Sequence, residues 1–401
     1  MRKVLYTVCA VLFSVLFLAN FLFTQPTLHA FAEETEVTAT NADGEDELKE
    51  SIEQLISDLD TDELQDYLNS LEEFPDWNVK NKLSELLNGG SLDYSDVFAA
   101  LFSVVGDSVA DMLPAFAVIV AIALLCGVLN TLKTSFLKDS TSEIIFFVCY
   151  AAVAAVLFSA LISVFSLTYN TMNGLKRQME VIFPLLLTLM AAGGGAVSAT
   201  VYQPAVAFLC GGVADILTEI VVPFTAVIIV LHTTSHFHKS VKLNGFISFF
   251  KSANKWLIGI GVTVFGIFLS AQGLTVASYD GISLRAAKYA ISNSIPIVGN
   301  FISGGFDIVL AGNVLIKNSV GMLGVFLIVA AALRPIVTMV GFSLFLRFTA
   351  AVCEPIGDER ISKFLTQIGD SVGYLVACLF SMAFLYFLTV LLLICSAGVI
   401  F

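Results

Sequence analysis

Two acidic side chains, four residues apart, lie in an otherwise apolar part of the sequence. Residues 181–231 contain Asp215 and Glu219 and no other charged residue, and this spacing puts both carboxylates on one face of a helix. A carboxylate inside a bilayer costs roughly 2.5–3.5 kcal/mol, so it faces protein or water. The pair therefore predicts a proton or ion relay or a pore lining, or else a structural ion pair or an interfacial position where the acids stay hydrated.

Basic residues of later apolar segments are the predicted partners of these acids. They are Arg334, which lies inside the apolar stretch 320–345, and Arg285 or Lys288. A Pro-Ile-Val-Gly break follows at 296–299, and broken helices at membrane depth pack against protein or line a cavity. The candidate structural or pore-lining positions are Asp215, Glu219, Arg285, Lys288, Pro296, Gly299, Asp307 and Arg334.

The other chemistry-bearing residues do not form a catalytic pattern. His232, His236 and His238 cluster, but the sequence His-Thr-Thr-Ser-His lacks the glutamate of a metalloprotease helix, so we interpret the cluster as a polar interfacial cap. The sequence G-x-x-x-x-G-K-[ST] is absent, which argues against a nucleotide-hydrolysing motor. All seven cysteines lie in or beside apolar runs and are predicted to be small core residues rather than disulfides or metal ligands. We therefore predict a protein that is not an enzyme and has no cofactor or metal.

Composition indicates the elements that must carry these residues. Of 401 residues, 57% are hydrophobic and only 13% are charged, about half the charged fraction of a soluble domain. The apolar runs are unbroken and long enough to span a bilayer as helices, whereas a transmembrane barrel would alternate apolar and polar residues. The predicted fold class is an all-α polytopic integral membrane protein with six to eight transmembrane helices, some of them broken or re-entrant.

Three regions follow from the distribution of charge. Residues 1–32 form a predicted signal peptide, with an uncleaved anchor as the alternative, because Arg2 and Lys3 precede an apolar run and an Ala-Phe-Ala cleavage pattern. Residues 33–111 carry 22 acids and 3 lysines, a net charge of 3 − 22 = −19. They predict a small acidic, helical, extracytoplasmic region, which is either a solvated face or a docking surface. Residues 112–401 form the multispan domain.

The positive-inside rule orients this domain. The segment 233–255 carries four lysines and no acid, so we expect it to be cytoplasmic. Predicted spans at 112–132 and 144–167 precede it. The stretch 181–231 must then cross the membrane an odd number of times, once with a re-entrant hairpin or three times. Later spans place the C-terminus outside.

Residues 281–324 carry a more specific pattern. Gly281-Ile-Ser-Leu-Arg-Ala-Ala-Lys leads into Ile295-Pro-Ile-Val-Gly, then into Asp307-Ile-Val-Leu and Leu315-Ile-Lys-Asn-Ser-Val-Gly321. In these motifs, and in its signal sequence, acidic leader and length, the chain resembles the stage III sporulation protein AE family of endospore-forming bacteria.

The resemblance implies a role that the residues alone do not. It implies a subunit, made in the mother cell, of a channel or secretion-like complex in the outer membrane around the forespore, needed for forespore integrity and late forespore gene expression. Implied partners are the other stage III A proteins, including an ATPase, and a forespore membrane protein across the intermembrane space. The alternative function is a self-contained secondary transporter that uses Asp215 and Glu219, which would require inverted repeats.

Overall fold

The computed structural model describes long helices. The described residues are 65, 80–81, 106, 110, 113–114, 116–125, 128, 139–237, 243–294, 299–355 and 359–396, without the side chains of 139–143, 145 and 271–311. All of them belong to one compact unit, Leu48–Phe401. The predicted signal peptide and most of the predicted acidic region lie outside the described residues.

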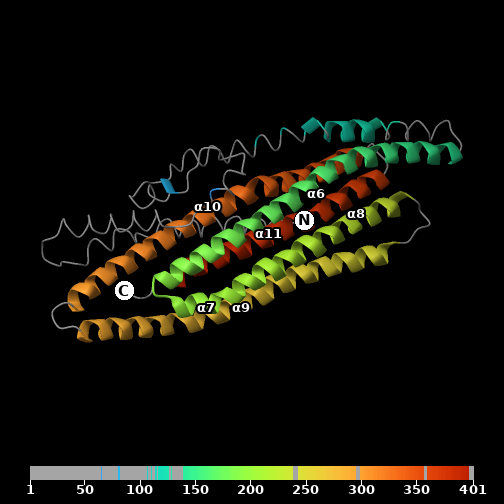
Figure 1. Cartoon of the computed structure of the whole chain (residues 1–401). Helices are drawn as coiled ribbons and strands as arrows, with labels where there is room; N and C mark the ends of the chain where they lie inside the picture. Colours follow the sequence, from blue (N-terminus) through green and yellow to red (C-terminus); the bar gives the residue numbers. More distant parts are fainter. Residues whose placement is uncertain are drawn as a thin grey trace. The chain divides into compact units, whose positions relative to one another are not determined.

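The longer described segments are helical throughout, with no strand among them, which confirms the predicted helical class for this part of the chain (Figure 1). The elements are α6 (Asp139–Ala192), α7 (Ala196–Phe208), the π-helices η1 (Leu209–Val213) and η2 (Ile216–Val221), α8 (Val222–Phe237), α9 (Asn244–Ser294), α10 (Gly299–Cys353) and α11 (Glu359–Ser396).

Five described stretches are long and apolar enough to cross a membrane. They are Phe146–Ala192, Ala196–His236, Asn244–Ser270, Gly312–Cys353 and Glu359–Ser396. A shorter apolar helix, Phe116–Leu125, lies within the predicted first span. The described residues thus supply five of the six to eight predicted transmembrane helices, together with this shorter helix.

The helix α6 is longer than the sequence pattern predicts. We expected a helix over 144–167 and a separate element from 181 onward, but one helix of 54 residues runs through both. The charged residues between them, among which are Lys176, Arg177 and Glu180, have straight side chains that favour a helix. Charge alone therefore did not end the helix, and α6 is about 81 Å long.

A tight turn at Gly193–Gly195 ends α6. Gly194 has φ of 89°, a conformation that residues other than glycine rarely adopt. The chain then returns as α7, η1, η2 and α8, which we call the return arm. The stretch 181–231 therefore holds the end of α6 and one returning candidate span, Ala196–His236.

Aromatic side chains fix how the long helices align within the bundle. Tyr150 of α6 packs on Phe364 of α11 with ring centroids 5.0 Å apart, and Phe183 packs edge-on against Tyr386 at 5.2 Å. Both contacts advance along the two helices in the same direction, so α6 and α11 are parallel. The helix α10 packs against both of them (Figure 1).

The cysteines depart from the prediction at one position. Cys149 is disulfide-bonded, so the expectation that no cysteine forms a disulfide is wrong. Cys353 and Cys378 are free and buried, as expected of small apolar core residues.

Candidate functional site

The two acids of the sequence analysis lie in the return arm, where its helical geometry changes. The π-helix η1 ends at Val213 and η2 begins at Ile216, so Asp215 sits between two π-helical turns, and Glu219 lies inside the second. A π-turn accommodates an extra residue in a helix and is frequent at functional sites. Gly211 and Gly212 lie within η1, where the helix is wider but does not end.

Asp215 forms an ion pair with a residue that the sequence analysis did not consider. Lys176 Nζ of α6 donates to Asp215 Oδ1 at 2.5 Å, and the two side chains are 29% and 43% exposed. The described partner is therefore Lys176 rather than Arg334, which is exposed on α10. Of the other expected partners, Arg285 and Lys288, the structure describes only the helical backbone.

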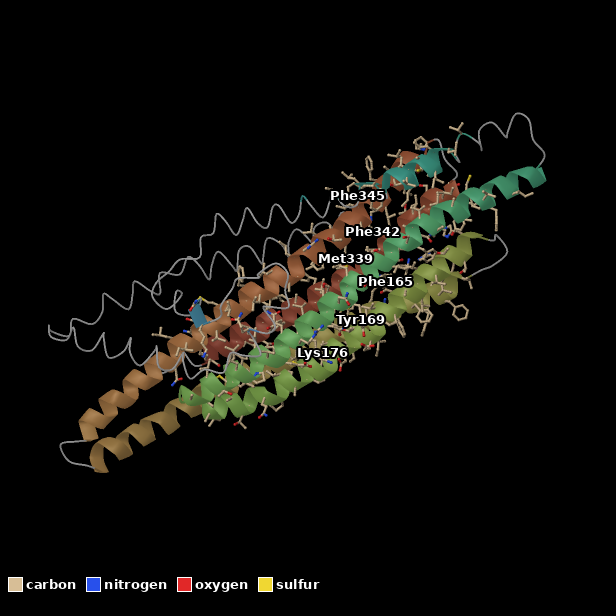
Figure 2. The ribbon with its side chains drawn as sticks, turned by 45° about the horizontal axis from the view of Figure 1, so that its top comes forward. Phe165, Tyr169, Lys176, Met339, Phe342 and Phe345 are labelled. Carbon is tan, nitrogen blue, oxygen red and sulfur yellow. The ribbon has the colours of Figure 1, made fainter. Side chains whose placement is uncertain are left out.

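Glu219 accepts a hydrogen bond from a neutral donor on α6, two helical turns before Lys176. Tyr169 Oη of α6 donates to Glu219 Oε1 at 3.2 Å, and this carboxylate is exposed. Figure 2 shows Tyr169 and Lys176 following each other along α6. Both acids therefore face α6, as their four-residue spacing predicts.

These side chains form part of a larger charged zone on the outside of α6 and the return arm. We define the polar belt as Tyr169, Lys176, Arg177, Glu180, Asp215 and Glu219; its outer members Arg177 and Glu180 are exposed. The belt holds two cations and three carboxylates. Of the predicted possibilities, a structural ion pair describes Asp215, and neither acid is buried inside the bundle.

The remaining predicted positions lie at or beyond the junction of α9 and α10. The helix α9 ends at Ser294 and α10 begins at Gly299, so the chain leaves the helical conformation at the predicted break. Pro296 lies outside the described residues. Asp307 lies in the first turns of α10, where the structure describes only the backbone.

One histidine of the cluster, His236, binds to the helix that carries it. His236 Nδ1 lies 2.9 Å from the carbonyl oxygen of His232 as a donor to it, and the His236 ring packs against Phe364 at 6.0 Å. His232 is buried. Among the described residues, no group of three or more potential metal ligands occurs.

A buried lysine that the candidate positions did not include joins α10 to α11. Lys317 is 1% exposed, and its Nζ donates to the carbonyl oxygens of Leu393 and Ile394 at 3.1 and 2.8 Å. Carbonyls of the last helical turn lack partners within the helix and carry partial negative charge. The stretch Leu315-Ile-Lys-Asn-Ser-Val-Gly321 thus contains the residue that caps the C-terminus of α11.

The described helices fit an integral membrane protein with a charged zone on its helix surface. Residues 77–398 match the family described as Stage III sporulation protein AE. The chain belongs to this family, which gives it a role in sporulation. It is similar to the Stage III sporulation protein AE of Bacillus subtilis (strain 168), with 26% identity over 370 residues that cover 90% of this chain and 92% of the relative. No solved structure matches the chain.

Proposed function

We propose that this chain is a non-enzymatic subunit of a multi-protein channel or secretion-like complex that joins the mother cell to the forespore. It lies in the outer forespore membrane, and its acidic region, residues 33–111, faces the intermembrane space. Its partners are the other stage III A proteins, including an ATPase, and a forespore membrane protein. Family membership supports the sporulation role, and the length of α6 supports a subunit that needs protein partners.

One band of the bundle matches the thickness of a bilayer. Ser396 Oγ lies 3.0 Å from Met190 Sδ, and Lys317 contacts the same last turn of α11. These three residues therefore lie at the same height along the axis of the bundle. From Lys317 to Arg334 no charged residue interrupts α10, a distance of about 26 Å. The return arm is free of charge from Ala196 to Asp215, about 28 Å.

We call this part of the bundle the charge-free band. The hydrocarbon core of a bilayer is about 30 Å thick, so the band fits it, with the polar belt at one boundary. Beyond the belt, α9, α10 and α11 carry charged residues again, among them Lys255, Arg347 and Asp370. The bilayer therefore encloses the band rather than the part of the bundle beyond the belt.

The helix α6 continues far beyond the band without becoming polar. Residues 144–175 contain no charged side chain and extend for about 48 Å. A helix tilted by 40° uses only about 39 Å to cross the hydrocarbon, whereas α6 is about twice that long. Its exposed apolar residues, among them Val148 and Ile162, therefore lie outside the lipid and require cover by protein. This observation carries the proposal.

Photo-crosslinking in sporulating cells tests the proposal. A crosslinking amino acid replaces Ile162, which is 68% exposed on α6 beyond the band, or Ile267, which is 65% exposed on α9. Ile267 lies in the band, because its neighbour Phe268 packs on Phe208 of the return arm. We expect position 162 to crosslink to another stage III A protein and position 267 to lipid. Lipid adducts alone at both positions would contradict the proposal.

A secondary transporter is the second candidate, and the π-helical turns around Asp215 favour it, because such turns are frequent at functional sites. The variant Asp215→Asn with Glu219→Gln separates the two functions. A transporter loses transport and still assembles, whereas a complex subunit tolerates the change or fails to assemble. The ion pair with Lys176 already gives Asp215 a structural role.

A further inference from the structure

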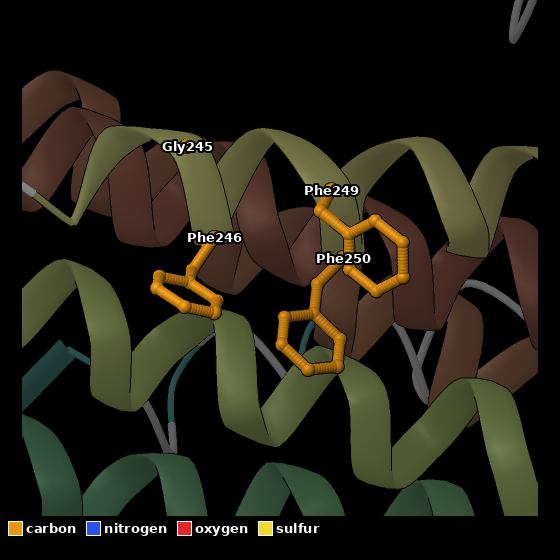
Figure 3. A pocket seen from close by; sticks show the side chains of 4 residues that line it. All are labelled: Gly245, Phe246, Phe249 and Phe250. Carbon is orange, nitrogen blue, oxygen red and sulfur yellow. The ribbon is translucent and has the colours of Figure 1, made fainter.

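The outer face of the α8–α9 hairpin is apolar and aromatic. Val227 and Val230 of α8 and Phe246, Phe249 and Trp256 of α9 are exposed. We call these five residues the aromatic face. A hollow of about 490 Å³ lies within it, lined by Gly245, Phe246, Phe249 and Phe250 (Figure 3).

Contacts beneath the aromatic face fix the position of α9 against α8. Phe250 packs edge-on against Phe224 of α8, with ring centroids 5.2 Å apart. Asn254 is fully buried, and its Nδ2 donates to Thr225 Oγ1 at 2.9 Å. Phe250, one wall of the hollow, is therefore held against α8.

Most of the aromatic face lies outside the charge-free band. The exception is Trp256, because Gly261 of α9 faces Val213 of η1 and Trp256, five residues before Gly261, therefore lies close to the level of the polar belt. Along the return arm, Val230 follows Asp215 of the polar belt by about 22 Å. The headgroup layer adds only about 5–8 Å to each side of the hydrocarbon core. Acyl chains therefore do not reach Phe246 and Phe249, and a contiguous exposed apolar surface in water marks a site of protein interaction.

The charges around the face favour an acidic partner. Between Glu219 and Asp280 the sequence has no acidic residue. Lys255 is exposed and forms no ion pair with any residue that the structure describes. Lys251 is half-buried, which leaves Lys255 as the exposed cation next to Trp256 among the described residues.

We propose that the aromatic face binds an acidic amphipathic helix supplied by a protein on the cytoplasmic side. Its apolar side chains, spaced by three and four residues, fill the hollow, as in other helix-in-groove complexes, and a carboxylate meets Lys255. The distance from Phe246 to Trp256, about 15 Å, accommodates about three turns of such a helix. This inference rests on the proposed function, because it assigns the face to one partner of the complex.

A crosslinker at Phe249 tests the inference in the full-length protein during sporulation. The matched control is Phe348 of α10, since both phenylalanines are 64% exposed. We expect position 249 to crosslink to one peptide that is helical, amphipathic and net negative, with a yield well above that at position 348. Lys255→Glu lowers the yield about fivefold or more, because charge pairs at an interface rim affect association. Lysine in place of the acid of the captured peptide restores the yield.

Two outcomes would overturn the inference: phospholipid adducts alone at Phe249, or a captured peptide whose yield does not respond to Lys255→Glu. Either outcome leaves the proposed function intact if Ile162 still crosslinks to a stage III A protein. If Ile162 yields only lipid, the proposed function fails instead, so the two failures are distinguishable.

Discussion

Gly321 of α10 lies where the backbone of α10 meets a side chain of α11. A Cβ atom at this position would lie 2.3 Å from Ile394 Cγ1 and 2.4 Å from Cδ1. Non-bonded carbon atoms prefer about 3.5–4.0 Å. We therefore predict that Gly321→Ala forces α10 and α11 apart by more than about 1 Å, or forces Ile394 into another rotamer.

The magnitude follows from two opposing effects. Overpacking of a well-filled interior costs about 1–3 kcal/mol. Replacement of glycine by alanine within a helix returns about 0.5–1 kcal/mol. We expect Gly321→Ala to lower the free energy of unfolding by up to about 2.5 kcal/mol. Gly373→Ala on α11 is the matched control, because a Cβ atom there meets nothing within 4 Å, and we expect it to be neutral or stabilising.

A double-mutant cycle with Ile394→Ala identifies the contact. Equilibrium unfolding of the purified full-length protein in detergent micelles gives the free energies of the wild type, both single variants and the double variant. Removal of Cγ1 and Cδ1 of Ile394 makes room for the new methyl group, so we expect a favourable coupling of about 1 kcal/mol or more. Additive effects, or a Gly321→Ala variant as stable as Gly373→Ala, would refute this reasoning.

Three further changes probe other contacts. Lys317→Met removes the ammonium donor to the carbonyl oxygens of Leu393 and Ile394, and we expect a loss of about 1–3 kcal/mol in the same unfolding measurement. Unchanged stability would show that water replaces the ammonium group. Lys176→Asp and Asp215→Lys should each reduce sporulation efficiency, and the double variant should restore it because it reverses the ion pair. If the double variant sporulates no better than either single variant, the ion pair does not account for the effect of the single changes. Thr225→Val removes the acceptor of buried Asn254, for an expected cost of about 1–2 kcal/mol, and a stability equal to the wild type would contradict that hydrogen bond.

Short stretches of the sequence were enough to predict the helical class and the positions where helices end. The glycine run at 193–195 and the Pro-Ile-Val-Gly sequence at 296–299 mark positions where α6 ends and where α9 gives way to α10. Each depends on backbone chemistry of a few adjacent residues, which a single sequence contains. The shared face of Asp215 and Glu219 was predictable for the same reason, since it depends only on their spacing.

The partner of Asp215 was not predictable, because it depends on the alignment of two helices. Lys176 lies between the predicted span at 144–167 and the stretch 181–231, so it was not considered as a partner. Its position opposite Asp215 follows from the continuity of α6 and from the turn at Gly194, which fix how the return arm lies against α6. The positive-inside rule and apolar run lengths contain no information about that alignment.

The two π-helical turns have a consequence for comparing family members. Each such turn holds one residue more than an α-helical turn, so the return arm carries surplus length at 209–213 and 216–221. A relative that lacks one residue within either segment keeps α7 and α8 facing the same neighbours, because the turn reverts to ordinary α-helix. A deletion within α8 instead rotates every later side chain of that helix by about 100°, so natural length variation in this arm should be confined to the two π-helical segments.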